Sequence, residues 1–407
     1  MYYRLLGDKQ PYQFNRWIHF KNSKPLIKRR VKITVSRILG LFVLSGWIPS
    51  GQAAGESVNL RYAKNFSIEE FASHRIVAVR NPWRNSGDTL FQFALVPKGA
   101  TVPALEKNVR VIKTPVERLA VLGTVYLAHV EALDLYRSLV GVAHAKYAND
   151  RKTLQQLKSG YTKSIPGESS IDIEATLSLQ ADLILASAVG DPQHDAHPLL
   201  ERTGQPVAVT AGYMETHPLG RAEWIRFTAA FFGKDELAKE VFDEIADRYE
   251  KLTALTRSIE SRPTVLANAP FAGIWHVPGG NSFTAQAIDD AGGEYLFSSL
   301  ESSGGVPVDL EKVFYEAIDA DFWIHPGQAR SLADLESMDA RFARFKAFLN
   351  GNVFNNSKLI GPGGGNEVWE RGVLRPDESL ADLIAIFHPE FLGEHEFTYY
   401  EKLPRSR

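Results

Sequence analysis

A long run of helix-forming residues, 234–259, divides this sequence into two halves that share one texture. On both sides of the run, short β-rich segments alternate with amphipathic helical stretches, which is the pattern of α/β layers with a mainly parallel sheet. Arg262-Pro263 ends the run, because proline cannot continue a helix interior. The sequence therefore predicts an α/β fold of two lobes, each with a mainly parallel sheet flanked by helices, joined by one long rigid interlobe helix.

The β-rich segments indicate the strands and the lobe boundaries. Segments 75–80 and 89–96 flank a loop rich in Pro, Asn and Gly, so they predict a hairpin that leads into the first lobe. The other expected strands are 118–122, 139–143, 183–186, 207–210, 264–267, 273–276, 320–325 and 358–360, with helices at 220–232 and 380–387. We predict a leader and signal peptide at 1–53, an N-terminal lobe at 54–233, the interlobe helix at 234–262 and a C-terminal lobe at 263–407.

The N-terminal part has the layout of a secretory signal peptide. Lys28, Arg29 and Arg30 precede an apolar run at 38–48, and Gly51-Gln52-Ala53 follows with small residues. The run is too short to span a bilayer, so we predict cleavage after Ala53, with an uncleaved membrane anchor as the alternative. The chain has no cysteine to carry a lipid. We therefore expect the mature chain in the periplasm and not embedded in the membrane.

Charge and motifs argue against two classes of function. With 46 basic and 48 acidic residues, the net charge of -2 creates no field that would gather nucleic acid, so no nucleic-acid partner is expected. The sequence holds no Gly-x-Ser-x-Gly elbow, no Gly-Lys-Ser or Gly-Lys-Thr phosphate loop and no His-Glu-x-x-His motif. We expect a binding protein without a cofactor. An exported two-lobe hydrolase remains the enzymatic alternative.

A degenerate repeat occurs once in each half. In both copies an Asp suited to begin a helix stands two residues before a Glu in the first helical turn, and the helix leads to an Ala-Asp pair and a buried strand. The copies hold Asp172, Glu174 and Ala181-Asp182, and Asp309, Glu311 and Ala320-Asp321. Helix capping alone explains such acids, but their matching places single out Glu174 and Glu311.

Several stretches resemble the iron-siderophore and cobalamin substrate-binding proteins of ABC importers. They are 114–121, 170–184, 218–225, 354–356 with 363–369, and 375–384 with 388–390, and the resemblance covers about residues 57–392. It implies two lobes that close slightly on a ligand held in the cleft between them, in a monomer that delivers its ligand to an inner-membrane ABC permease. It also implies that Glu174 and Glu311 dock onto arginines of that permease.

The ligand site is expected at the loops that follow the strands, because open α/β sheets bind ligands at the carboxyl ends of their strands. An aromatic collar with an arginine suits a large, partly apolar chelate such as a ferric siderophore, haem or cobalamin. The predicted ligand-binding residues are Tyr147, Tyr213, Trp275, Trp369 and Arg371. For each aromatic residue, packing in a core is the alternative.

Three histidines, His194, His197 and His217, raise the question of a metal site. They crowd one part of the first lobe, whereas a site between lobes needs ligands from both. We therefore expect a solvated loop here and no metal site, with a zinc- or haem-binding chaperone as a further alternative function.

Overall fold

The computed structural model describes residues 55–167, 171–191 and 193–406. The predicted signal peptide, its cleavage after Ala53, and Ser170, the first residue of the stretch 170–184, lie outside these residues. Among the described residues, no helix combines the length and the apolar character needed to cross a membrane.

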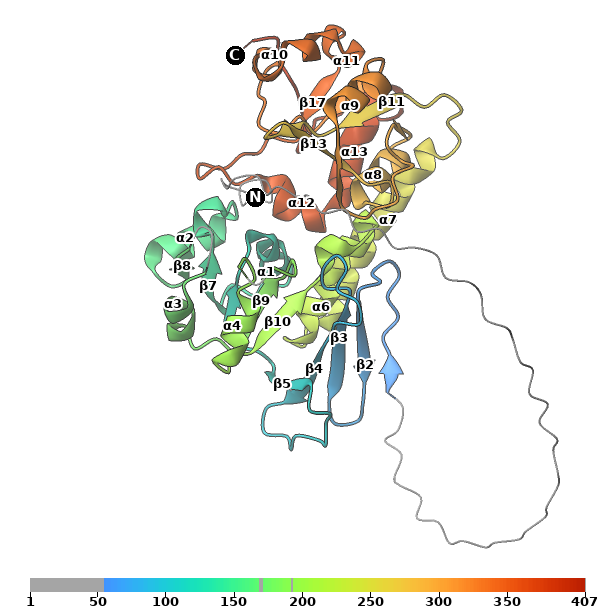
Figure 1. Ribbon diagram of the computed structural model, residues 1–407. Coiled ribbons are helices and arrows are strands. Elements are labelled where there is room, and N and C mark those ends of the chain that lie inside the picture. Colours follow the sequence, from blue (N-terminus) through green and yellow to red (C-terminus); the bar gives the residue numbers. More distant parts are fainter. Residues whose placement is uncertain (1–54, 168–170, 192, 407) are drawn as a thin grey trace, which may run out of the picture. The chain divides into compact units, whose positions relative to one another are not determined.

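A five-stranded sheet begins the described chain (Figure 1). Its strands are β1 (Glu56–Ser57), β2 (Phe66–Glu70), β3 (Arg75–Arg80), β4 (Leu90–Pro97) and β5 (Val109–Thr114). Strands β3 and β4 pair antiparallel, as the predicted hairpin requires. The sheet packs on the helix that precedes the long interlobe helix, since the Phe66 ring lies 5.7 Å from Phe227 and the Phe93 ring 6.3 Å from Phe231.

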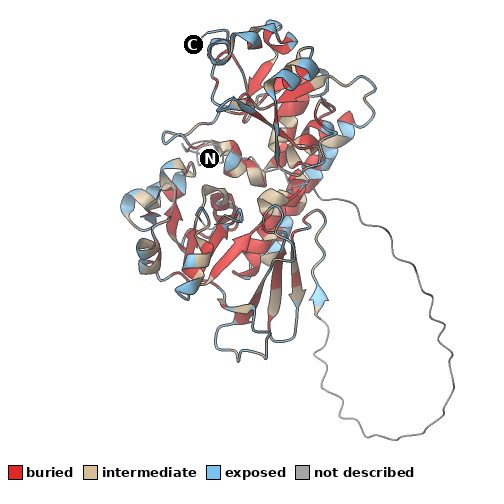
Figure 2. Cartoon of the chain, viewed as in Figure 1, coloured by how far each residue is buried: buried red, intermediate tan, exposed pale blue. Residues whose placement is uncertain are grey.

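The first lobe is built on a parallel sheet in the order β10-β9-β6-β7-β8. The strands are β6 (Leu119–Val121), β7 (Leu139–Ala143), β8 (Lys163–Ile165), β9 (Leu183–Ser187) and β10 (Val207–Thr210). The helices are α1 (Leu127–Ala132), α2 (Arg151–Ser159), α3 (Ile173–Ser178), α4 (His197–Arg202), α5 (Pro218–Ala222) and α6 (Trp224–Ala230). The central strands are buried almost throughout (Figure 2), which is why they read as continuous apolar runs.

The long helix α7 (Asp235–Thr256) runs from the first lobe to the second (Figure 1). Asp235 and Glu236 stand in its first turn, where acidic side chains favour the helix dipole. One face is buried through Ala238, Phe242 and Ile245, and it packs against α13 of the second lobe. A single straight element therefore joins the lobes.

The second lobe has a sheet in the order β14-β11-β16-β17-β18, in which only β18 is antiparallel, and a smaller antiparallel sheet, β12-β13-β15. The strands are β11 (Thr264–Ala267), β12 (Pro270–Phe271), β13 (Ile274–Pro278), β14 (Glu294–Tyr295), β15 (Gly305–Val308), β16 (Phe322–Ile324), β17 (Val353–Asn355) and β18 (Glu401–Lys402). The helices are α8 (Phe283–Asp290), α9 (Leu310–Ala317), α10 (Leu332–Met338), α11 (Lys346–Leu349), α12 (Arg371–Leu374) and α13 (Pro376–Phe387). The predicted class, two α/β lobes joined by one long helix, is confirmed.

One predicted strand is wrong. Residues 358–360 form no strand; Ile360 makes only an isolated bridge with Asn366, and Leu359 is 42% exposed. The strand of this region is β17, five residues earlier. Its three buried residues, Val-Phe-Asn, are too few to show a period in the sequence.

The sequence repeat corresponds to one bonding pattern made in both lobes. Asp182, just before β9, accepts hydrogen bonds from the backbone N–H groups of Glu117 at 3.0 Å and Arg118 at 3.1 Å, just before β6. Asp321, just before β16, accepts one from the backbone N–H of Thr264 at 2.9 Å, at the start of β11. In each lobe these are neighbouring parallel strands. The Asp of each Ala-Asp pair therefore ties the amino ends of two central strands together.

Candidate functional site

The carboxyl edge of the first sheet carries a row of hydroxyl groups. The Tyr126 hydroxyl lies 2.8 Å from both Ser187 Oγ and Thr210 Oγ1, at the ends of β9 and β10, and burial raises the pKa of Tyr126 to about 12. The half-buried Tyr213 donates from its hydroxyl to the Ala188 carbonyl at 2.8 Å. Tyr213 thus stands at the predicted edge, with its hydroxyl fixing the loop that follows β9.

This edge touches the second lobe through glycines. The segment Gly361–Gly365 follows β17, and it lies against residues 146–149, which follow β7. A Cβ on Gly363 would lie 1.5 Å from the Lys146 carbonyl oxygen, and one on Gly365 would lie 1.9 Å from that of Tyr147. Only glycine permits this approach of the two backbones. Tyr147, half-buried, therefore lies where the lobes meet.

A buried carboxylate joins the lobes beside these glycines. Glu370, just before α12, accepts hydrogen bonds from the backbone N–H groups of Asn149 at 3.1 Å and Asp150 at 2.9 Å, at the start of α2. Burial raises the pKa of Glu370 to about 8. Two amide donors from the first lobe thus hold a carboxyl group of the second.

Other contacts cross between the lobes. Arg84, in the loop between β3 and β4, donates to Ser302 Oγ at 2.8 Å. Helix α5 packs against α8 and α12, and the Arg221 guanidinium carbon lies 4.0 Å from the centre of the Phe283 ring on α8. We call the contacts made by Arg84, Arg221, Glu370 and the Gly361–Gly365 segment the lobe junction.

Trp369 and Arg371 belong to the segment of the second lobe that lies at this junction. Trp369, in a short 3-10 helix (Glu367–Trp369), is 46% exposed, so its ring is open to solvent. Arg371 is half-buried and already paired, since it donates to Glu378 Oε1 at 2.5 Å. Its charge is thus balanced by the chain itself.

The expectation that Trp275 contacts a ligand is wrong for this structure. The side chain has 0% exposure, and its ring lies 5.6 Å from Trp323 and 5.7 Å from Phe342. Its indole N–H donates to the Ala267 carbonyl at 3.0 Å. Trp275 is a core residue of the second lobe, with its polar atom satisfied.

The two acids singled out by the repeat occupy matching positions. Glu174 and Glu311 are both exposed, in the first turns of α3 and α9. Asp172 accepts from the Ala175 N–H at 2.9 Å and caps α3 as expected. Asp309 stands at the N-cap of α9, but its side chain makes no capping hydrogen bond, which corrects the expectation for that residue.

The three histidines have three different surroundings. His194 lies 2.7 Å from Asp191, His197 packs between Trp83 and Phe91, and His217 accepts from the Leu219 N–H at the start of α5. Across the described part of the chain, no group of three His, Cys, Asp or Glu side chains is placed to hold a metal ion.

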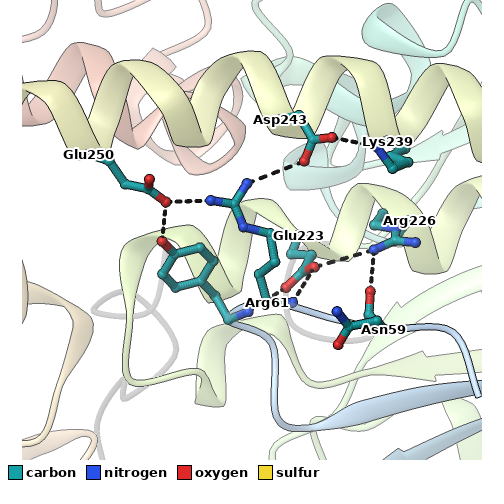
Figure 3. A network of polar contacts seen from close by, with 8 residues as sticks. Asn59, Arg61, Glu223, Arg226, Lys239, Asp243 and Glu250 are labelled. Atoms are coloured by element: carbon teal, nitrogen blue, oxygen red, sulfur yellow. Dashed lines mark hydrogen bonds and ion pairs between the residues drawn. The ribbon is translucent and has the colours of Figure 1, made fainter.

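A surface pocket of about 500 Å³ lies where residues 59–61 cross α6 and α7. Figure 3 shows the polar contacts around it. Its lining residues are Asn59, Arg61, Arg226, Lys239, Asp243 and Asp247. Arg61 bridges Asp243 at 3.3 Å and Glu250 at 2.5 Å, and the buried Glu223 accepts from the Arg61 N–H at 2.9 Å. These charges are largely paired with one another, and the pairs tie residues 59–61 to α6 and α7.

Sequence reasoning missed two junction residues, Arg221 and Glu370. Both lie in or beside stretches that carried the family resemblance, but their roles depend on partners far away in the sequence. Glu370 binds residues more than 200 positions earlier, and no local pattern marks that contact.

Comparisons with known proteins agree with this architecture. An uncharacterized lipoprotein of Methanocaldococcus jannaschii is 28% identical, over 84% of this chain and 85% of that protein. A periplasmic heme binding protein from Pseudomonas aeruginosa shares the fold, with a TM-score of 0.51 and 20% identity over 67% of this chain and 93% of that one. An ABC-type Fe3+-hydroxamate transport protein from Saccharomonospora viridis also has a TM-score of 0.51, with 18% identity over 67% of this chain and 94% of that one. The model of the periplasmic binding protein family matches residues 119–357, which is more than half of the sequence, and the chain belongs to that family.

Proposed function

We propose that this protein is the substrate-binding protein of an ABC importer, which captures an iron complex (ferric siderophore or haem) or cobalamin between its lobes. One observation carries the proposal: loops that follow strands of the two sheets, after β7 and after β17, meet at the lobe junction. The carboxyl ends of strands are where open α/β sheets bind ligands. A ligand held there would touch both lobes, which is what a carrier needs to signal that it is loaded.

The side chains at the junction suit a large, partly apolar ligand. The exposed Trp369 and the half-buried Tyr147 offer aromatic surface with polar tips. The related fold of the heme binding protein and of the hydroxamate transport protein supports an iron complex as the class of ligand. We propose Tyr147, Tyr213 and Trp369 as ligand-contacting residues. Arg371 is paired with Glu378, so we propose that it holds the segment next to Trp369 in place and does not neutralise the ligand.

Delivery would use the exposed acids Glu174 and Glu311. One carboxylate on each lobe can orient the loaded protein on an inner-membrane permease and raise the encounter rate without tight affinity. A signal peptide cleaved after Ala53 would place the mature protein in the periplasm. The chain has no cysteine to carry a lipid, whereas its relative from M. jannaschii is named as a lipoprotein.

The test is a binding titration of the purified protein with haem, a ferric hydroxamate, a ferric catecholate and cyanocobalamin. We expect one class to bind and to quench tryptophan emission, with the quench reduced in Trp369→Phe. Native mass spectrometry of protein taken from its own periplasm would identify the natural ligand. Turnover of a chromogenic ester or glycoside, without binding of any of these complexes, would contradict the proposal and favour a hydrolase.

A further inference from the structure

Arg221 is a charged side chain without a counter-ion. Its Nε is enclosed without a hydrogen-bond partner, and among the described residues the guanidinium forms no ion pair or hydrogen bond. Arg371 and Arg375, by contrast, bind Glu378 at 2.5 Å and Asp377 at 2.7 Å. Burial lowers the pKa of Arg221 to about 10. Arg221 is half-buried, and a charge with an enclosed polar atom is costly unless it is paired, so the missing counter-ion is unusual.

The guanidinium contacts the side chain of the first residue of a helix in the other lobe. Its carbon is 4.0 Å from the centre of the Phe283 ring, and Phe283 is the first residue of α8. Ser282 caps this helix by accepting from the Ala285 N–H at 3.2 Å. The N–H groups of Phe283 and Thr284 have no acceptor within the described chain, as is usual in a first turn.

The first turn of α8, whose Phe283 side chain the guanidinium contacts, favours an anion over a cation. The N-terminus of a helix carries partial positive charge, which repels a guanidinium and attracts an anion. The contact with the Phe283 ring offsets part of the cost, because the ring face attracts cations. The acids of α8 lie at its other end and are already bound, Asp289 to Arg262 at 2.5 Å and Asp290 to Tyr249 at 2.6 Å.

We infer that Arg221 and the first turn of α8 form a binding site for an anionic group, a carboxylate or a phosphate, of the small molecule that the junction captures. The inference rests on the proposed function. It narrows the ligands of the protein to iron complexes or cobalamins that have a carboxylate or phosphate free to bind the protein. Arg221 belongs to the first lobe and α8 to the second, so a single anion at this site would contact both lobes. The guanidinium fork matches two oxygens of the anion, and helix N–H groups are ready donors for a third.

The experiment measures anion binding to the dialysed full-length protein by calorimetry and by melting temperature. The probes are inorganic phosphate, citrate and ferric citrate, with an uncharged ferric trihydroxamate for comparison. The variants are Arg221→Met, which keeps the length and removes the charge, and Arg221→Lys, which keeps the charge and loses the fork. The matched control is Arg202→Met, which removes an exposed charge at the end of α4.

We expect at least one anion to bind and to raise the melting temperature of the wild type. Arg221→Met should weaken that binding about tenfold or more, Arg221→Lys less, and Arg202→Met not at all. Without anion, Arg221→Met should melt no lower than the wild type, because it removes a charge that has no counter-ion and keeps a side chain of similar length against Phe283. If Arg221→Met does not fold, a loss of several-fold in Arg221→Lys with an unchanged melting temperature supports the site.

Two results would overturn the inference. One is wild-type anion affinity in either Arg221 variant, which would make Arg221 a packing residue. The other is binding of the neutral chelate with no binding of any anion, which leaves the proposed function standing. Anion binding that depends on Arg221, together with no binding of any iron complex or cobalamin, would instead keep the site and remove the proposed function.

Discussion

At the scale of single residues, burial separates two tryptophans that look alike in the sequence. Trp275 and Trp369 both lie near glycine-rich loops, yet one has 0% exposure and the other 46%. The sequence does not distinguish them, because the packing around Trp275 comes from Trp323, Phe342 and Phe345, about 50 to 70 positions further on. The prediction of Arg371 rested on the sequence alone, which does not show that Arg371 pairs with Glu378 whereas Arg221 has no carboxylate partner.

We predict opposite outcomes for the two tryptophans. Trp275→Ala should lower the free energy of unfolding by about 3 to 5 kcal/mol, because it removes a large buried ring. Trp369→Ala should change it by less than about 0.5 kcal/mol and should weaken ligand binding. Urea denaturation and ligand titration of both variants check this. A large destabilisation by Trp369→Ala with unaltered ligand affinity would assign that ring to packing.

At the scale of elements, the sequence predicts best where an apolar, β-branched run is short and bounded by turn residues. The expected segments 75–80, 139–143, 207–210 and 264–267 match β3, β7, β10 and β11. The start of α7 is also predicted to within one residue, because its acids and its apolar period occur together. The contact between Gly361–Gly365 and residues 146–149 cannot be predicted from the sequence. The glycines read as an ordinary turn, because the backbone that they contact lies more than 200 residues earlier in the chain.

The helices α3 and α9 carry a prediction about transport. Reversing Glu174 and Glu311 together, with Glu174→Lys and Glu311→Lys, should abolish uptake in cells and leave ligand affinity unchanged, because exposed charges more than about 10 Å from a site are screened at physiological salt. Each single reversal should have a smaller effect than the pair. Glu336→Lys, an exposed reversal on α10, is the matched control and should transport normally. Normal uptake by the double variant would rule out a docking role.

At the scale of the whole molecule, the lobe junction should respond to pH through Glu370. Burial raises its pKa to about 8 from an ordinary 4.5, so between these values the folded chain holds a proton that the unfolded chain has lost. The contribution of this group to stability is therefore fully present below about pH 4.5 and is lost as the pH rises through about 8. We expect the melting temperature of the wild type to fall relative to Glu370→Gln over that range.

Thermal melts of both proteins at about pH 5, 6.5 and 8.5 would measure this difference. Glu336→Gln, which alters an exposed carboxylate, should follow the wild type at every pH. A constant difference between wild type and Glu370→Gln across the range would show that Glu370 stays ionised at the junction.

The aspartates that tie the central strands bear on the order in which the chain is assembled. Asp182 reaches back 64 to 65 residues and Asp321 reaches back 57, so each bond closes entirely inside its own lobe. Chains grow from the N-terminus, and domains generally fold as units in that order. The first lobe can thus complete its own sheet before Thr264 has been synthesised. The bonds of Glu370 and Arg84, by contrast, need residues of both lobes, so a ligand can be enclosed between the lobes only after the chain has been made to about residue 370.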